Sequence, residues 1–340
     1  MPKPRIVYVV GAGLSAGLGF PTIQSLLPEL WDRLEDKGLA DGLADIIRFH
    51  HPEFNPARRS TFPDIERLLS EMQANAHLFE HSRPATGRFT TKDLDERRGQ
   101  LLLEIAQWFH EIQKRALSTP PAWLNDLAGA IKRENAQVIS FNWDLVLDEL
   151  LFGADLKRSS YSFGEANGPS LIKPHGSLNW YRHDLGQHLK PDRRFWLCGK
   201  KDQRVFAFRP YRAPTSTKRD YMPFIVPPVY GKTFEDDLSK HLWRQSVAVL
   251  SKATEVRFMG YSLPEADFHA RFILRCGFHN QESGALTAKG KRAHPTGRAK
   301  VTVVELKDDA HQRIERTVGW ACDFQKMKIE DWIAGGGLLA

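Results

Sequence analysis

Cysteine is scarce in this chain of 340 residues, and its three cysteines lie far apart in the sequence. Cys198, Cys276 and Cys322 form no Cys-x-x-Cys pair, the spacing on which zinc ribbons depend. We therefore expect no zinc, no other metal and no disulfide framework. Unpaired cysteines are typical of reducing compartments, so the expected location is the cytoplasm.

Long hydrophobic runs are missing as well. The apolar run closest to the start, at residues 6–10, is far shorter than the roughly 20 residues that a membrane-spanning helix needs. Glycines follow this run directly, which also argues against a signal peptide. We therefore expect a protein that does not associate with a membrane.

The composition is otherwise that of a globular protein with a large core. Hydrophobic residues make up 41% of the chain and charged residues 26%, and 9 Trp, 20 Phe and 7 Tyr require burial. An intrinsically disordered chain is thereby excluded. At roughly 150 residues per domain, the length predicts about two domains or one enlarged α/β domain.

The chain carries a net charge of +7, and part of the excess is concentrated near its C-terminal end. The basic residues of the stretch 289–300 are Lys289, Lys291, Arg292, Arg298 and Lys300. We interpret this stretch as a solvated loop, with a direct contact to nucleic acid or to a partner protein as the alternative. No aromatic side chains alternate with these charges, so the stretch does not predict a stacking platform for single strands.

Two hydrophobic periodicities divide the chain. A run of β-branched residues at 6–10 predicts a buried parallel strand. From residue 22 to about 135, apolar residues recur at helical spacing, which predicts four or five helices. Further strand patterns follow at 137–141, 170–173, 205–208, 224–226, 255–259 and 300–305.

Strand and helix patterns alternate in the second half of the chain. Helical patterns follow the strand patterns at 137–141, 255–259 and 300–305. Such alternation is typical of an α/β fold with a doubly wound parallel sheet. We therefore predict an α/β domain built from residues 1–22 and 135–340, with a large helical insertion at 23–134.

A glycine-rich turn follows the first predicted strand. Gly11-x-Gly13-x-x-Ala16 matches the dinucleotide-binding fingerprint, in which backbone N–H groups approach a pyrophosphate at a helix N-terminus. A tight structural turn is the alternative. The acidic residue that normally ends the second strand about 20 positions later would here lie inside a predicted helix, at Asp32 and its acidic neighbours. We therefore expect a nucleotide-binding arrangement other than the ordinary Rossmann one.

Polar residues follow the strand predicted at 137–141. Asn142 and Asp144 are two positions apart, so both would enter the crevice at the carboxyl ends of the strands. Doubly wound sheets bind their ligands in this crevice. For Asp144 the alternative is a helix cap in front of Leu145.

Two later strand ends carry further candidate residues. His175 follows the strand predicted at 170–173, and its side chain titrates near neutral pH, which suits general-base work. Gly260 and Ser262 follow the strand predicted at 255–259, where a glycine allows a ligand to approach the backbone closely.

Four segments resemble the sirtuin family: GAGLSAGLGFP at 11–21, FNWD at 141–144, KPHGSLNW at 173–180 and GYSLPEAD at 260–267. The segment IVPP at 225–228 is also similar to one that is common in the sirtuin-like branch. The motifs follow the family's order, which makes the joint match specific. The resemblance implies a sirtuin-like variant of the Rossmann fold.

The chain departs from the protein-deacylating sirtuins in informative ways. It lacks the cysteine pairs of their zinc module and the glutamine that precedes Asn142 in their motif. Residues 20–24 read FPTIQ where the deacylases have an Asp-Phe-Arg run, and the helical block exceeds their insertion. In these respects the chain resembles the bacterial sirtuin-like NAD hydrolases of anti-phage defence.

The resemblance implies a role for each residue of the site. Asn142 would orient the attacked ribose or the attacking water, and His175 would be the base. Asp144 would face the amide of the nicotinamide. The remaining NAD-binding residues would be Ala12, Gly13 and Ser15 for the phosphates and the nearer ribose, Gly260 and Ser262 for the adenosine, and Glu305 for the adenine ribose. For Glu305 a plain surface position is the alternative.

The expected function is cleavage of NAD to ADP-ribose and nicotinamide. An NAD-dependent deacylase and a non-catalytic sensor of NAD or ADP-ribose remain as alternatives. An NAD hydrolase that was always active would deplete its host, so we expect restraint by homo-oligomer assembly or by a partner. The resemblance implies a HerA-type ATPase or an Argonaute protein as that partner.

Overall fold

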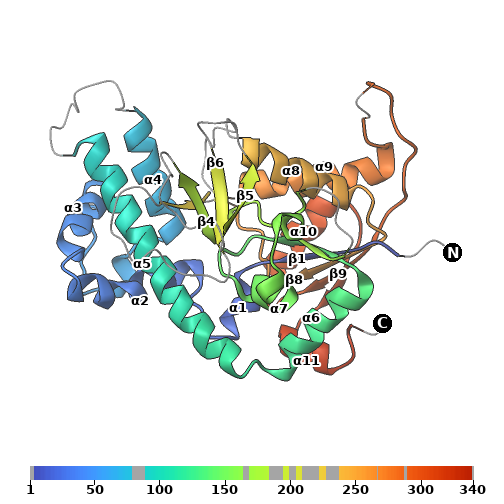
Figure 1. Cartoon of the computed structure of the whole chain (residues 1–340), viewed down its shortest axis with the longest axis horizontal. Helices are drawn as coiled ribbons and strands as arrows, with labels where there is room; N and C mark the ends of the chain where they lie inside the picture. Colours follow the sequence, from blue (N-terminus) through green and yellow to red (C-terminus); the bar gives the residue numbers. More distant parts are fainter. Residues whose placement is uncertain are drawn as a thin grey trace.

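The computed structural model combines a six-stranded parallel sheet, a four-stranded antiparallel sheet and a body of helices (Figure 1). It describes residues 4–78, 89–163, 168–183, 194–198, 204–208, 222–226, 237–265, 267–286 and 289–338. Among these residues, no helix combines the length and the apolar character that crossing a membrane requires.

The parallel sheet confirms the α/β doubly wound fold that the sequence predicts. Its strands are β1 (Ile6–Val10), β2 (Gln137–Ser140), β3 (Ser170–Ile172), β8 (Glu255–Met259), β9 (Lys300–Val304) and β10 (Asp323–Gln325). The order is β10-β9-β8-β1-β2-β3, and every neighbouring pair is parallel. The chain therefore runs from β1 out to β3 and then returns to the other side of β1. The switch point of the topology, where such sheets bind ligands, lies between β1 and β8.

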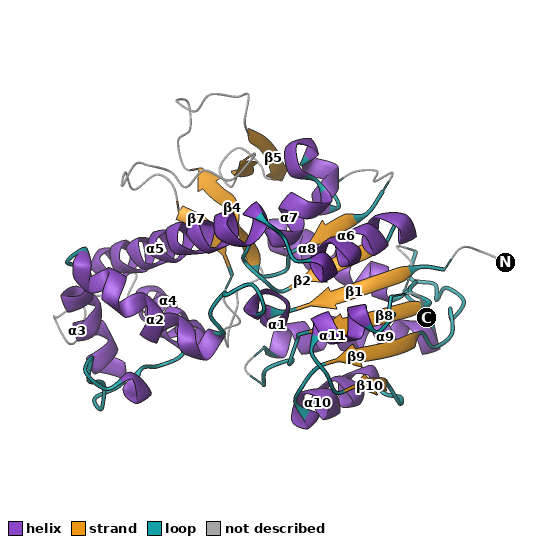
Figure 2. Cartoon of the chain, turned by 90° about the horizontal axis from the view of Figure 1, so that it is seen from below, coloured by secondary structure: helices purple, strands orange, loops and turns teal. Residues whose placement is uncertain are grey.

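Helices cover both faces of the parallel sheet (Figure 2). They are α1 (Ala12–Ala16), α6 (Ala122–Glu134), α7 (Val146–Leu151), α8 (Asp237–Leu250), α9 (Phe268–Ser283), α10 (Asp308–Val318) and α11 (Ile329–Ala334). Helix α9 packs against α8 and α10, and α6 packs against α7 and α11. Strand β1 is buried along its whole length, as the continuous β-branched run predicts for a parallel strand covered on both faces.

A second apolar core lies in the helical body, which is formed by α2 (Ile23–Asp36), α3 (Ala40–His50), α4 (Ile65–Leu78) and α5 (Thr91–Ser118). Together with α6, the described residues of the stretch 22–135 contain five α-helices, where the periodicity predicts four or five. Capping boxes at Thr22 and Thr90 begin α2 and α5. Helix α6 connects the two cores, because its Leu124 belongs to the core of the helical body and its Leu127 and Ile131 belong to the core of the parallel sheet. Figure 2 shows the helical body beyond the carboxyl ends of the parallel strands.

The antiparallel sheet was missed at the level of sequence. Its strands are β4 (Gly176–His183), β5 (Arg194–Cys198), β6 (Arg204–Phe208) and β7 (Met222–Ile225), in the order β5-β6-β4-β7. The strand patterns at 205–208 and 224–226 are therefore real strands, but they pair outside the parallel sheet. Parallel pairing needs a long crossover, usually a helix, whereas antiparallel strands can be joined without one. Short 3₁₀ turns complete the described elements at Arg59–Thr61, Gly153–Asp155 and Arg158–Tyr161.

Candidate functional site

The candidate site lies at the carboxyl edge of the parallel sheet. Five of the six parallel strands are followed there by a segment that the sequence singles out: β1 by Gly11, β2 by Asn142, β3 by His175, β8 by Gly260 and β9 by Glu305. Parallel pairing aligns these ends, so segments that are far apart in the sequence become neighbours. The arrangement centres on the switch point between β1 and β8.

The glycines at the switch point touch backbone to backbone. The N–H of Gly13 donates to the carbonyl oxygen of Gly260 at 2.8 Å, and a Cβ added to Gly13 would lie 2.7 Å from the Cα of Gly260. Gly260 has a φ of +61°, a left-handed conformation that favours glycine. These contacts fix the start of α1, at Ala12, against the end of β8. The structure thus gives Gly13 a packing role in addition to the predicted contact with a ligand.

Asn142, Ser15 and Asp144 form one hydrogen-bonded group. The side-chain amide of Asn142 donates to the carbonyl oxygen of Gly11 at 2.9 Å and to Oγ of Ser15 at 3.1 Å. Ser15 in turn donates to Oδ2 of Asp144 at 2.6 Å. All three side chains are buried. Residues predicted from separate motifs are thereby joined, and the amide plane of Asn142 is fixed by the two donations.

The carboxyl of Asp144 also supports the start of α7. Its Oδ1 accepts the N–H of Val146 at 3.0 Å, so the capping alternative describes a real contact of the same side chain. Burial raises the pKa of the Asp144 carboxyl, while the charge of Lys173 and the hydrogen bond from Ser15 lower it. Desolvation dominates this balance.

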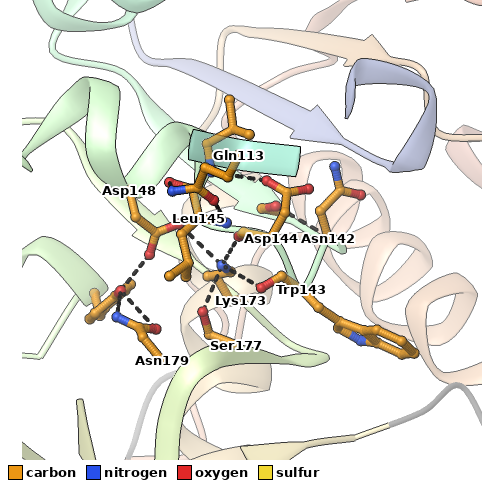
Figure 3. A network of polar contacts seen from close by, with 12 residues as sticks. Gln113, Asn142, Trp143, Asp144, Leu145, Asp148, Lys173, Ser177 and Asn179 are labelled. Atoms are coloured by element: carbon orange, nitrogen blue, oxygen red, sulfur yellow. Dashed lines mark hydrogen bonds and ion pairs between the residues drawn. The ribbon is translucent and has the colours of Figure 1, made fainter. Parts of the chain in front are cut away.

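Lys173 is fully buried and holds the loop after β2 in place. Its Nζ donates to the carbonyl oxygen of Asp144 at 2.6 Å, to Oγ of Ser177 at 2.7 Å and to Oδ2 of Asp148 at 3.1 Å. Figure 3 shows Lys173 at the centre of this network. Asp148 also accepts a hydrogen bond from Tyr161. Lys173 belongs to the KPHGSLNW motif but was not among the predicted site residues, and its position directly after an apolar strand was the signal in the sequence.

His175 lies against a carboxylate, that of Asp267, which the sequence did not predict as a site residue. Its Nε2 is 3.2 Å from Oδ2 of Asp267, and both side chains are buried. Tyr261 donates to the same Oδ2 at 2.8 Å, and Oδ1 of Asp267 accepts the N–H of Ala270 at the start of α9. Asp267 is the last residue of the GYSLPEAD segment, so the motif contained the signal, but only the fold brings it to the histidine.

Aromatic rings connect His175 to the Asn142 group. The ring of Phe141, directly before Asn142, meets the His175 ring edge-on with centroids 5.0 Å apart. The same ring stacks on Tyr261 at 4.3 Å. The predicted base, His175, and the predicted orienting residue, Asn142, therefore belong to one buried cluster, which Phe141 connects.

Two predicted residues lie farther out. Ser262 presents its carbonyl oxygen to Arg313, at 3.2 Å from Nε and 3.1 Å from Nη2. Glu305 lies at the end of β9, two strands from β1, and its Oε1 accepts the N–H of Leu306 at 2.8 Å. Neither residue has a recorded contact with the Asn142 group among the described residues. In the part of the chain that the structure describes, no group of three or more His, Cys, Asp or Glu side chains is placed so that it could hold a metal ion.

Comparisons with known proteins give similarity at the level of structure. No protein-family model matches the chain, and no match was found among the curated proteins. Sir2Tm bound to a propionylated peptide is similar with a TM-score of 0.41 and 13% identity, over 98% of this chain and 94% of that one. A Sir2 homolog in complex with NAD gives a TM-score of 0.43 and 12% identity, over 97% of this chain and 87% of that one.

Proposed function

We propose that this chain is an NAD⁺ glycohydrolase that cleaves NAD⁺ to ADP-ribose and nicotinamide. The observation that carries the proposal is the placement of the Asn142–Ser15–Asp144 group and the His175–Asp267 pair in one buried cluster, where the ring of Phe141, next to Asn142, packs on His175. Both lie at the carboxyl edge of the sheet, beside the glycine turn at the switch point. The resemblance of the four sequence motifs to sirtuins supports the same substrate.

The chemistry needs few groups, and this site contains groups of the required kind. When the nicotinamide–ribose bond is cleaved, the cationic nicotinamide ring leaves as neutral nicotinamide, and positive charge builds up on the sugar. A positioned water, a base and oriented dipoles are sufficient for such a step, with little help from an acid.

The geometry supports distinct roles for the two central residues. Asn142 has its amide fixed by Gly11 and Ser15, so it can orient the ribose or the attacking water without first reorganising. His175 can accept a proton from that water, and the Asp267 carboxylate orients the imidazole and stabilises its charged form. Asp144 would face the nicotinamide amide.

The outer parts of the substrate would be held around this centre. Ala12, Gly13 and Ser15 would bind the phosphates and the nearer ribose at the start of α1. Gly260 and Ser262 would line the adenosine, and Glu305 would face its ribose hydroxyls.

Chromatography of NAD⁺ incubated with the purified protein tests the proposal. Nicotinamide and ADP-ribose formed without any peptide would support it. Turnover that requires an acetylated peptide and yields O-acetyl-ADP-ribose would identify a deacylase instead. Binding of NAD⁺ without turnover, alone and with every candidate activator, would identify a sensor.

We further propose that the activity is restrained and serves anti-phage defence. Uncontrolled hydrolysis would exhaust the NAD⁺ of the host. We therefore propose that the chain is inactive by itself and that its assembly or the binding of a partner activates NAD⁺ cleavage. A HerA-type ATPase or an Argonaute protein is the kind of partner that the sequence resemblance implies. The helical body α2–α5 is the proposed contact surface. A monomer, established by light scattering, that hydrolyses NAD⁺ at full rate alone would contradict this restraint.

A further inference from the structure

A pocket between α9 and α10 gathers positive charge. Its volume is about 270 Å³, and it is lined by Glu265, Arg271, Arg275, Arg313, Arg316 and Thr317. The four arginines face one carboxylate in the lining, and Arg313 is also paired with Asp309 at 2.7 Å, so an excess of positive charge remains. Like charges four residues apart on a helix, as at Arg271 and Arg275, repel each other and destabilise the helix. A bound anion would relieve this repulsion.

Three of the arginines are held in place with donors to spare. Within the described residues, Arg271 donates to the carbonyl oxygen of Glu265 at 3.1 Å, and Arg275 donates to that of Val318 at 3.2 Å. Arg316 donates to its own helix, at Gln312. A guanidinium has five N–H donors in a planar fork, so one carbonyl fixes its position while other donors stay available to a phosphate.

Two phenylalanines flank these arginines on the outer face of α9. Phe268 is 55% exposed and Phe272 is 59% exposed, which is high for side chains of this size. Residues three and four apart lie on the same face of a helix, so Phe268, Arg271, Phe272 and Arg275 form one continuous stripe. We call these four residues the α9 stripe.

We propose that the α9 stripe and the adjoining arginine pocket bind single-stranded nucleic acid. Arginine forks match phosphate oxygens, and exposed aromatic rings stack on unpaired bases. This is the combination of charge and aromatic side chains that the basic stretch 289–300 lacks. The net charge of +7 adds a favourable long-range attraction for a polyanion.

The proposed surface lies beside the candidate active site. Arg313, which lines the pocket, holds the carbonyl oxygens of Ser262 and Leu263, and α9 begins directly after Asp267. The phosphates of the dinucleotide are therefore the competing occupant of the pocket. Competition with ADP-ribose separates the two possibilities.

The charge part of the proposal is tested with a labelled single-stranded oligothymidylate, by fluorescence anisotropy over a series of salt concentrations. We expect the double variant Arg275→Gln/Arg316→Gln to bind about tenfold more weakly, with the slope of log affinity against log salt shallower by about 1.4. The matched control is Lys289→Gln/Lys291→Gln, which removes the same charge from the basic stretch and should change affinity much less.

The aromatic part is tested with Phe272→Ala, whose exposed ring contributes little to the core. We expect binding of the single strand to weaken about fivefold or more, and duplex DNA to bind more weakly than the single strand. The melting temperature of each variant confirms that it is folded. Absence of binding by the unaltered chain, equal binding of duplex, an equal loss in the lysine control, or displacement of the oligonucleotide by ADP-ribose would each overturn the proposal.

Discussion

Gln113 of the helical body holds the backbone of Leu145 through two hydrogen bonds. Its Oε1 accepts the N–H of Leu145 at 3.0 Å, and its Nε2 donates to the carbonyl oxygen of Leu145 at 3.3 Å (Figure 3). Leu145 directly follows Asp144, so helix α5 determines where the loop after β2 lies. A movement of α5 would therefore shift the loop that carries Asp144 in the candidate active site.

Gln113→Leu tests this connection. The substitution approximately keeps the volume of the side chain and leaves the buried N–H of Leu145 without its acceptor, whereas the carbonyl oxygen of Leu145 still accepts the N–H of Glu149. We therefore expect a loss of about 1–3 kcal/mol in the free energy of unfolding. NAD⁺ turnover should fall with it. Gln107→Leu, on the same helix but bonded to Lys37 at the surface, is the control for unfolding in denaturant and for turnover. Equal effects of the two substitutions would refute the connection.

Asn142→Ala and His175→Ala should each abolish cleavage of NAD⁺. Loss of an orienting amide or of a base typically lowers the rate by roughly 10²–10⁴. Asn142→Ala carries an additional structural cost, because Gly11 and Ser15 lose their donor. NAD⁺ consumption and thermal melting are measured side by side. Near-normal hydrolysis by a well-folded His175→Ala protein would show that the base, and with it the reaction, is misassigned.

Trp143→Ala provides the contrast to these two variants. Trp143 is buried in the core of the helical body, although it lies between two site residues in the sequence. Truncation of a buried tryptophan costs about 3–5 kcal/mol, so we expect an unstable protein. A stable but inactive Trp143→Ala protein would instead indicate a direct part in binding the substrate.

Asp267→Asn should separate the orienting role of Asp267 from its structural one. Asparagine still accepts the N–H of Ala270 at the start of α9 through its carbonyl oxygen, and its NH2 group can donate to the hydroxyl of Tyr261, but it offers no negative charge to His175. We expect a melting temperature close to that of the unaltered protein and a kcat lower by about tenfold or more, with little change in KM. Asp308→Asn, at the exposed start of α10, is the matched control. An unchanged kcat would remove Asp267 from the mechanism.

Lys173→Met should destabilise the protein strongly. Removing one member of a buried ion pair leaves the other charge uncompensated, and here Asp148 would lose its cation at a typical cost of about 3–5 kcal/mol. Lys326→Met breaks the exposed pair with Asp308 and should have little effect. Unfolding in denaturant measures both. Similar values for the two variants would mean that Lys173 is not the organiser of this network.

Asp144→Asn should change how stability depends on pH. Burial raises the pKa of Asp144 in the folded protein above its ordinary value of 3.8. As the pH rises above about 4, the unfolded chain releases this proton first, so the ionised carboxyl lowers the free energy of unfolding. The variant lacks this penalty, so the difference between its free energy of unfolding and that of the unaltered protein should increase in favour of the variant as the pH rises above about 4. Parallel curves in denaturant unfolding would contradict the raised pKa.

Short-range signals were enough to predict much of the fold. The β-branched run at β1 and the helical spacing of the apolar residues in α2–α5 are properties of neighbouring residues, and the structure has these elements where the patterns place them. The positions of Asn142 and His175 after strands were also predictable. The sequence could not show that Asn142 is bonded to Ser15, because that contact depends on how β1 and β2 pair.

The sequence by itself determined the parallel α/β architecture, the glycine turn and the residues that end its strands. Tertiary structure alone decided the antiparallel sheet, the pairing of His175 with Asp267 and the hydrogen bonds between Gln113 and Leu145. The physical reason is the range of the interactions. Hydrophobic periodicity is set by adjacent residues, whereas these contacts join segments that become neighbours only after the strands have paired and the helices have packed.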